Sequence, residues 1–407
     1  MTVERMRVAL SGNYAAALAV KNVDVDVVSV YPITPSTATA ERIAQYIADG
    51  ELDAELITVE SEHSALSGAV GASAAGARTF SVTSSQGLLL MHEILYIAAG
   101  LRLPIVMAVA DRSVSAPINI WSDLSDTLDQ RDTGWMIVYS TNVQELYDRL
   151  IQAYRIAEDP NVMLPMMVCY DGYNLSHTYS PVDILTDEEA REFTPKRLPS
   201  YKYRLDPDNP MSIGGFGSPD YYMETKVQTA EAFKESIGTI EKVGKEFGER
   251  FGRTYNLYDT FMMEDADVAL IGMGSVMGTA KVAVRQLRKE GHKVGLVNLH
   301  VYRPFPTERL VRELKDLKAL GVLGRAVSPG APGGVSDALT LDVMSSLYLY
   351  SINIPVKTFV AGLGGRDIPP SDFVKMFEEL EAVARGESTR PRLLYVSLRS
   401  ENKEVVL

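Results

Sequence analysis

The 407-residue sequence has only one cysteine, Cys169. A single thiol cannot form an internal disulfide, and it cannot hold an iron–sulfur cluster, which usually takes four thiolate ligands. Cys169 lies in the apolar run VMLPMMVCY, which favours a buried strand thiol over a catalytic one. The five histidines show no metal-ligand spacing such as HExxH, so the sequence predicts no metal site in this chain.

Long apolar runs and positive net charge are also lacking. The hydrophobic stretches stop well short of the roughly 20 residues that a membrane-spanning helix needs. The N-terminus, MTVERMRVALSGN, has no sustained apolar segment or small-residue cleavage site, so we expect no secretory signal and a cytoplasmic location. The net charge of −13 argues against binding to nucleic acid, which requires neutralisation of phosphates. We therefore expect neither a membrane nor a nucleic acid as a partner.

Short β-branched runs alternate with helical stretches in the first part of the chain. A predicted helix over 143–158 lies between the predicted strands at 104–110 and 162–170. Repeated βα units of this kind predict a parallel sheet covered by helices. The predicted strands span residues 25–31, 55–60, 78–84, 104–110 and 162–170.

The same βα pattern restarts at Asp265. Between the two series, residues 175–255 form an excursion rich in Pro, Gly, Asp and Tyr that ends in an amphipathic helix, and we expect it to cover a subunit contact. The sequence thus predicts an α/β protein with two doubly wound parallel-sheet domains, at 1–255 and 256–407. In the second domain, the predicted strands span 268–274, 293–299, 320–327 and 356–362, and the predicted helices span 276–290, 307–318, 335–349 and 371–385.

Ligands gather at the carboxyl ends of parallel strands, so site residues are expected in the loops that follow the predicted strands, and three of these loops carry candidates. The loop YPITPST is stiffened by prolines and offers the hydroxyl group of Thr34. The next loop carries Glu60 and Glu62 before an Ala/Gly-rich helix. A carboxylate at that position either takes part in chemistry or only stabilises the helix dipole.

A third loop carries Arg112 directly after an apolar strand. Its guanidinium group is solvated, is paired with Asp111 or Asp123, or is available to an anionic substrate. Without further information, these residues indicate only an α/β cleft suited to an anion.

Two further motifs resemble known sites but fit them poorly. Gly272, Gly274 and Gly278 lie between a strand and a helix, as in a dinucleotide fingerprint, but their spacing is GxGxxxG and no acidic residue follows at the expected distance. A tight strand-to-helix turn is the simpler interpretation. Ser84 and Ser85 also follow a strand, but they lack the GxSxG context of a nucleophilic serine.

Several longer motifs resemble the α subunit of pyruvate:ferredoxin oxidoreductase (pyruvate synthase), in the 2-oxoacid:ferredoxin oxidoreductase family. They are YPITPST, VESEHSAL with GASAAGARTFSVTSSQGLLLMHE, and RSVSAPINIWSDLSDTLDQRDTGW. The resemblance continues through VYRPFP and VAGLGGRDI, and so covers essentially the whole chain. It implies that the first domain is the pyrimidine-binding domain of thiamine diphosphate enzymes, and that the second resembles the transketolase C-terminal domain. One departure, GNYA at 12–15 in place of the common GNEA, lies outside the expected chemistry.

The resemblance also assigns roles to three residues. Glu62 matches the glutamate that contacts N1′ of the aminopyrimidine, where a carboxyl group favours the imino tautomer that activates the cofactor. Glu60 does not match this position. Thr34 and Arg112 match the substrate-binding threonine and arginine, which would hold the 2-oxoacid by its oxygens and its carboxylate.

The implied reaction is the reversible oxidative decarboxylation of pyruvate with coenzyme A to acetyl-CoA and CO₂, with electrons passed to ferredoxin. Thiamine diphosphate would be shared with a β subunit, because this chain has no GDG…N diphosphate signature. Mg²⁺ and the [4Fe-4S] clusters would lie in partner subunits of the β, γ and δ types, because this chain has too few cysteines to bind clusters.

Other functions stay open on the same resemblance. The alternative substrates are branched-chain 2-oxoacids, 2-oxoglutarate and oxalate. Thr34 argues against oxalate, since the oxalate enzymes carry a basic residue there, and the loop SAPINIW at 115–121 looks less like that of the 2-oxoglutarate enzymes. A non-catalytic assembly subunit is a different class of function, which the presence of Glu62 and Arg112 disfavours. A nicotinamide-dependent dehydrogenase would rest on the glycines at 272–278 alone.

Overall fold

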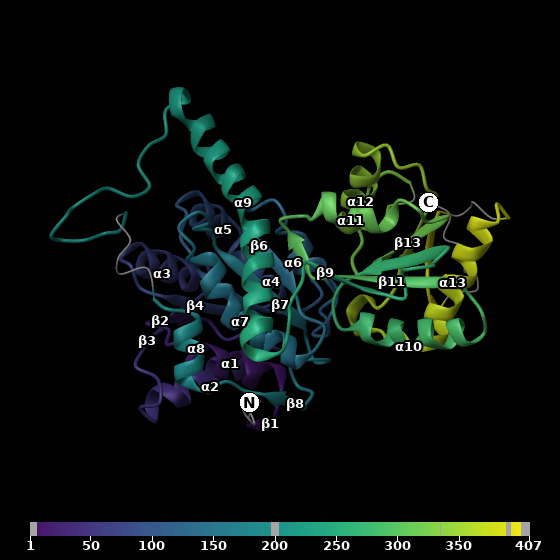
Figure 1. Ribbon diagram of the computed structural model, residues 1–407. Coiled ribbons are helices and arrows are strands. Elements are labelled where there is room, and N and C mark those ends of the chain that lie inside the picture. The colour runs from purple at the N-terminus through teal and green to yellow at the C-terminus, as the bar shows by residue number, and fades with distance from the viewer. Residues whose placement is uncertain (1–5, 197–202, 334, 388–391, 400–407) are drawn as a thin grey trace.

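The computed structural model describes residues 6–196, 203–333, 335–387 and 392–399, and two large sheets within these ranges organise the fold. Figure 1 shows the sheets in two adjoining bodies, each covered by helices. The predicted α/β class is confirmed. The boundary near residue 255 stays a prediction, although one short strand from beyond it joins the first sheet.

In the described part of the chain, the first sheet has seven strands in the order β12-β6-β7-β5-β4-β2-β3. All pairs are parallel except β12 with β6. The central strands consist almost wholly of apolar residues because helices cover both of their faces. The strands are β2 (Val27–Val30), β3 (Glu55–Thr58), β4 (Thr79–Thr83), β5 (Val106–Asp111), β6 (Met136–Tyr139), β7 (Met166–Asp171) and β12 (Val301–Arg303).

Alternate residues of these strands enter two different cores. In β5, Val106 and Ala108 pack with the helices of one face, whereas Met107 and Val109 pack with those of the other. The first group of helices is α1 (Gly12–Asn22), α2 (Thr37–Ala48) and α7 (Val143–Ala157). The second group is α3 (Glu62–Ala74), α4 (Ser85–Leu90) and α5 (His92–Gly100), followed in the chain by the short α6 (Ser125–Leu128).

The second sheet has six strands in the described residues, in the order β15-β14-β13-β10-β11-β9, and only β9 is antiparallel to its neighbour. One of its faces shares a single apolar core with the first sheet, so the two bodies are packed together. The strands are β9 (Tyr258–Phe261), β10 (Val268–Gly272), β11 (Val294–Leu299), β13 (Ala319–Gly324), β14 (Val356–Val360) and β15 (Leu393–Tyr395). The helices are α10 (Val276–Lys289), α11 (Thr307–Leu314), α12 (Ala338–Leu349), α13 (Pro370–Ala384) and the 3-10 turn η2 (Leu363–Gly365).

The predicted excursion contains more structure than a loop and a helix. Its first part forms β8 (Ser180–Asp183), paired with β1 (Arg7–Leu10), and α8 (Asp187–Phe193). The expected amphipathic helix is α9 (Pro219–Phe251), whose first turns extend beyond the body in Figure 1 and are exposed on every side. Residues 197–202 of the excursion lie outside the described residues.

Most predicted strands and helices are present within a few residues of their expected ends. The strand predicted over 162–170 begins only at Met166 in β7. Each of the two mainly parallel sheets also has one antiparallel strand at an edge, β12 in the first and β9 in the second. The prediction also missed α1 and several short strands. These strands are only three or four residues long, too short to produce a periodic pattern.

Arg78, directly before β4, joins the ends of three helices. Its guanidinium group makes two hydrogen bonds of 2.7 Å to the carboxylate of Glu158, just after α7. It also donates to the carbonyl oxygens of Val23 after α1 (2.7 Å) and Thr194 after α8 (3.0 Å). The side chains of Arg78 and Glu158 are almost fully buried, so the cation compensates both the carboxylate and the negative ends of the helix dipoles.

We expect Arg78→Ala to lower the free energy of unfolding of the full chain by about 3–5 kcal/mol, because Glu158 would be left as an unpaired buried charge. Denaturant-induced unfolding measures this loss. The control is Arg385→Ala, which removes a pair with Glu387 on the surface and should change stability little. A similar small effect for Arg78→Ala would show that the buried pair is not needed.

Candidate active site

The three predicted site residues lie at one edge of the first sheet. Thr34 follows β2, Glu62 follows β3 and Arg112 follows β5. These strands are parallel and lie in the order β5-β4-β2-β3, so the loops after them meet at their common carboxyl edge.

Arg112 and Thr34 are in direct contact. The Arg112 Nη1 atom donates to the carbonyl oxygen of Thr34 at 2.9 Å, and Nε donates to the carbonyl oxygen of Asn119, also at 2.9 Å. Arg112 is only 6% exposed, yet no carboxylate of the described residues lies within ion-pair distance of it. It pairs with neither Asp111 nor Asp123, which leaves its charge available to an anion.

Glu62 is the first residue of α3 and is 7% exposed. Its carboxylate has no hydrogen-bond partner in the described part of the chain, whereas the neighbouring Glu60 is exposed and accepts a hydrogen bond from Ser64 at 2.5 Å. Gly87 in α4 lies so close that an added Cβ would be 2.6 Å from Glu62 Oε1 and 2.5 Å from Thr83 Oγ1. A buried, unpartnered carboxylate beside a backbone without a side chain is suited to binding a ligand.

Other polar groups near Glu62 or Arg112 are unsatisfied, at the end of β4, at the start of α4 and in the loop after β5. They are buried and have no hydrogen-bond partner among the described residues. Buried polar atoms are usually paired, so unpaired ones at this edge suit a place where a ligand supplies the missing partners. The atoms are Thr83 Oγ1, Ser84 Oγ, Gln86 Nε2 and Ser113 Oγ.

Asp126 connects the β4 and β5 loops. One of its carboxylate oxygens accepts hydrogen bonds from the backbone N–H groups of Ser85 (2.8 Å) and Arg112 (3.0 Å). Burial raises the pKa of Asp126, against the effect of these hydrogen bonds, and the charge of Asp123 adds to the rise. Asp126 therefore fixes the backbone at the start of α4 relative to that of Arg112.

A buried ion pair joins the edges of the two sheets. Asp171 at the end of β7 pairs with Arg325 directly after β13, and both side chains are at most 2% exposed. Burial alone would raise the pKa of Asp171, but Arg325 and hydrogen bonds from Ser275 and Ser122 hold it below the ordinary value. The carboxyl ends of the strands in both sheets therefore face each other across this pair.

The same pair explains the glycine motif after β10. The backbone N–H of Ser275 donates to Asp171 Oδ2 at 2.7 Å, so a carboxylate occupies the place of a dinucleotide phosphate. Gly274 has φ +81°, and an added Cβ would lie 3.0 Å from Asp171 Oδ2. The motif is the tight turn that the spacing favoured.

Sequence reasoning missed Asp126, Asp171, Arg325 and Asn119 as residues that shape this edge. Asp171 and Arg325 each follow an apolar strand, the same signal that identified Arg112. No local pattern distinguishes Asp126 or Asn119, because their partners lie in loops distant in the sequence. As expected, Cys169 is buried, and burial raises the pKa of its thiol.

Within the described residues, no helix has the length and apolar character needed to cross a membrane. Among those residues there is also no cluster of three or more His, Cys, Asp or Glu side chains arranged to hold a metal ion.

Two family models match the chain in succession. Residues 18–245 match the model described as "Pyruvate flavodoxin/ferredoxin oxidoreductase, thiamine diP-bdg". Residues 266–373 match "Pyruvate:ferredoxin oxidoreductase core domain II". The first match contains all three predicted site residues.

Several curated relatives are similar over almost their whole length. The pyruvate synthase subunit PorA of Methanocaldococcus jannaschii is 47% identical over 392 residues, which cover 96% of this chain and 97% of the relative. The same subunit of Methanothermobacter thermautotrophicus is 44% identical and covers 97% and 99% of the two chains. The ketoisovalerate oxidoreductase subunit VorA of Pyrococcus horikoshii is 45% identical and covers 93% and 94%.

Two solved structures share the fold. A 2-oxoglutarate:ferredoxin oxidoreductase from Magnetococcus marinus has a TM-score of 0.71 at 20% identity; the match covers 92% of this chain and 65% of that longer chain. A split gene transketolase has a TM-score of 0.54 at 13% identity, covering 93% of this chain and 100% of the other. These likenesses confirm the predicted relation of the fold to transketolase.

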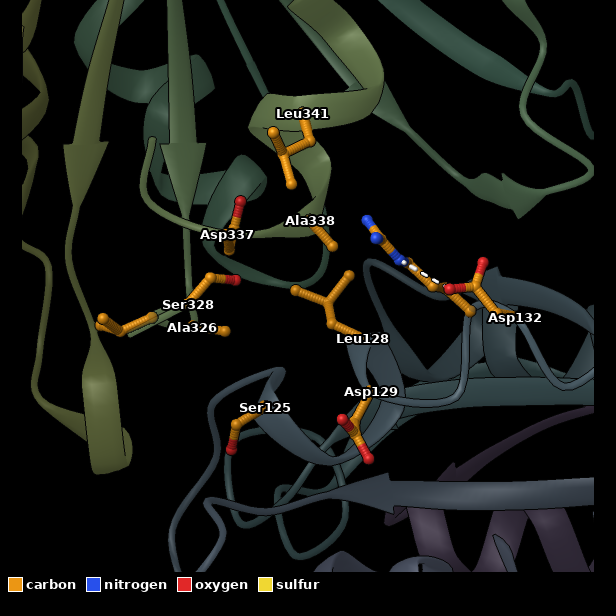
Figure 2. Close-up of a pocket in the computed structure, with 11 residues that line it drawn as sticks. Ser125, Leu128, Asp129, Asp132, Ala326, Ser328, Asp337, Ala338 and Leu341 are labelled. Carbon is orange, nitrogen blue, oxygen red and sulfur yellow. Dashed lines mark hydrogen bonds and ion pairs between the residues drawn. The ribbon is translucent and has the colours of Figure 1, made fainter. Parts of the chain in front are cut away.

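A separate pocket of about 290 Å³ lies between the two bodies, and none of the three predicted residues lines it. Figure 2 shows Ala338 and Leu341 of α12 facing Leu128 and Asp129 across it. Asp337 caps α12 by accepting a hydrogen bond from the Thr340 N–H at 3.2 Å, while its Oδ2 atom has no partner among the described residues. Burial raises the pKa of Asp337 to about 6.

This raised pKa predicts how the stability of the chain depends on pH. At pH values between the ordinary pKa of 3.8 and the raised pKa of about 6, the folded chain keeps the proton of Asp337 and the unfolded chain releases it. Raising the pH through this window therefore favours unfolding. We expect Asp337→Asn, which keeps a capping oxygen, to lose less stability than the wild type over this range.

Unfolding midpoints measured from pH 4 to pH 7 test this prediction. Asp129→Asn is the control, because Asp129 lines the same pocket but is exposed. Parallel pH curves for the wild type and Asp337→Asn would contradict the assigned proton.

Proposed function

This chain belongs to the pyruvate flavodoxin/ferredoxin oxidoreductase family, and on that basis we propose that it is the α subunit of a thiamine diphosphate-dependent pyruvate:ferredoxin oxidoreductase. The reaction is the reversible oxidative decarboxylation of pyruvate with coenzyme A to acetyl-CoA and CO₂, with electrons passed to ferredoxin. The observation that carries the proposal is a buried, unpartnered carboxylate, Glu62, at the same sheet edge as Arg112, whose charge is uncompensated by any carboxylate of the described residues.

The residues around Glu62 fit the pyrimidine end of thiamine diphosphate. The ring offers nitrogen atoms and an amino group, which complement a carboxylate and the unsatisfied polar atoms beside it. Gly87 packs directly against both side chains, since a Cβ there would collide with Glu62 and Thr83, so the missing side chain at this position lets the Glu62 carboxylate lie where it does. When bound, thiamine diphosphate supplies the nucleophilic carbon and accepts the electron pair left when CO₂ departs.

Each of the three residues has a distinct task in the proposed site. Glu62 holds a proton at N1′ of the pyrimidine, and its burial strengthens that hydrogen bond. Arg112 pairs with the carboxylate of the 2-oxoacid, and its fixed guanidinium group orients the substrate. Thr34 is exposed and its carbonyl oxygen is bound to Arg112, so we assign its hydroxyl group to the same substrate.

Other chains complete the enzyme in this proposal. The relatives are named as subunits of pyruvate synthase. A β-type subunit would bind the diphosphate and Mg²⁺, and subunits of the γ and δ types would help to carry the [4Fe-4S] clusters that pass electrons to ferredoxin. We further propose a cytoplasmic location, and a subunit contact made by the excursion at 175–255.

Branched-chain 2-oxoacids are the second candidate substrates. The ketoisovalerate relative is 45% identical to this chain, close to the 44–47% of the pyruvate synthase relatives. Overall identity therefore does not separate the two substrates. A non-catalytic assembly subunit is disfavoured because it would have no use for the buried, unpartnered Glu62.

We expect Glu62→Gln to lower kcat for pyruvate-dependent reduction of a viologen dye by roughly 10²- to 10⁴-fold, because an amide cannot hold the proton as a carboxyl group does. The assembled complex is assayed at saturating thiamine diphosphate. Glu60→Gln is the matched control, since Glu60 is exposed two residues away and bound to Ser64. Near-normal kcat in Glu62→Gln would refute the mechanism.

The substrate is tested on the wild-type complex purified with its native partners. Pyruvate, 2-oxoisovalerate, 2-oxoglutarate and oxalate are compared with and without coenzyme A. We expect the highest kcat/KM for pyruvate, and activity that depends on coenzyme A. A higher value for 2-oxoisovalerate would assign the chain to the branched-chain enzymes instead.

A further inference from the structure

The position of Arg112 depends on the loop that follows it. Its guanidinium group is held by two carbonyl oxygens, of Thr34 and Asn119, at 2.9 Å each. Thr34 lies in a loop stiffened by prolines, whereas residues 115–118 of the other loop are all exposed. Ser122 fixes the end of the loop from Ser113 to Asp123 by donating to Asp171, but Asn119 itself needs a further anchor if it is to hold the arginine.

That anchor comes from the second sheet. The turn η2 after β14 brings Gly364 and Gly365 against the loop. The Asn119 Nδ2 atom donates to the carbonyl oxygen of Gly364 at 3.1 Å, and the backbone N–H of Gly365 donates to the carbonyl oxygen of Ser122 at 2.8 Å. The Gly364 N–H donates to the Asp123 carboxylate at 3.0 Å. Three hydrogen bonds thus join the turn to the loop.

Asn119 is the residue that connects this turn to the arginine. Its side-chain Oδ1 atom accepts a hydrogen bond from the Trp121 N–H at 2.8 Å while its Nδ2 atom reaches Gly364. Its own carbonyl oxygen meanwhile binds Arg112 Nε. One residue therefore contacts the second sheet, the loop and the predicted substrate-binding side chain.

The two glycines allow this close approach. Gly364 and Gly365 have φ of +58° and +78°, a region that favours glycine. An added Cβ would lie 2.6 Å from Asn119 Nδ2 at position 364 and 2.3 Å from Trp121 Cβ at position 365. Any side chain at either position would push the loop away.

We propose that the Gly364-Gly365 turn, acting through Asn119, sets the position of Arg112 and thereby the affinity of the enzyme for its 2-oxoacid. This rests on the proposed function for the identity of the ligand. Asn119 is a positioning residue here, since it acts on the substrate through the arginine. The second sheet thus contributes to substrate binding without placing a side chain on the substrate.

The first test separates KM from kcat in the assembled complex. Asn119→Ala should raise the KM for pyruvate about three- to tenfold, the range that one hydrogen bond covers. It should leave kcat and the KM for coenzyme A nearly unchanged, because Glu62 is untouched. Arg112→Ala alone should raise the KM for pyruvate by about 30-fold or more. In the Arg112→Ala background, Asn119→Ala should add almost nothing.

The second test uses glycines matched in backbone conformation. Gly365→Ala should raise the KM for pyruvate, whereas Gly386→Ala should not. Gly386 has φ +75°, close to the +78° of Gly365, but an added Cβ there meets nothing within 4 Å. The pair therefore separates backbone strain from displacement of the loop.

A third measurement does not depend on the reaction. Amide hydrogen exchange over Ser113–Asp123 should be faster in Asn119→Ala and Gly365→Ala than in the wild type and Gly386→Ala. An unchanged KM for pyruvate in Asn119→Ala, an additive effect in the Arg112→Ala background, or unchanged exchange would each overturn the inference. If the wild-type complex oxidises no 2-oxoacid, the proposed function fails, and the exchange result alone decides whether the turn anchors the loop.

Discussion

The buried pair between Asp171 and Arg325 is the constraint on which the arrangement of the two sheets depends. A fully buried cation and anion are costly to separate, so each end must stay where the other is. Asp171 ends β7 and Arg325 follows β13, and the pair therefore brings the carboxyl edges of the two sheets together. Ser122 also donates to Asp171, at 2.7 Å, which fixes the end of the Arg112 loop at the same point.

This arrangement gives neighbouring charged groups different tasks. Arg325 is committed to Asp171, whereas Arg112 is held by neutral carbonyl oxygens and keeps its charge for an anion. Burial and the charges of Asp126 and Asp171 raise the pKa of Asp111 well above its ordinary value. The Asp111 carboxyl group accepts a hydrogen bond from Thr127 and forms no ion pair with Arg112 in the described residues, so it does not compete with a substrate carboxylate for that side chain.

The sequence was sufficient to predict the elements that have a long apolar pattern. The βα order and the central strands were predicted closely, and the three residues predicted for the site, Thr34, Glu62 and Arg112, follow β2, β3 and β5. The contacts between loops were not predictable in this way. The role of Asn119 depends on its hydrogen bond to Gly364, which lies 245 positions later in the chain. A contact between such distant residues produces no periodic pattern in a single sequence.

The unsatisfied groups at this edge fit the proposed ligand site. Each buried polar atom without a partner costs about 1–3 kcal/mol, and folding alone gains nothing from leaving Thr83 Oγ1, Gln86 Nε2 and Ser113 Oγ in that state. A ligand that pairs with them recovers this energy on binding. The Glu62 carboxylate lies beside Thr83, near the same Gly87 backbone, and would act on the pyrimidine from there. Such a cost is expected at functional sites, where stability is given up for binding.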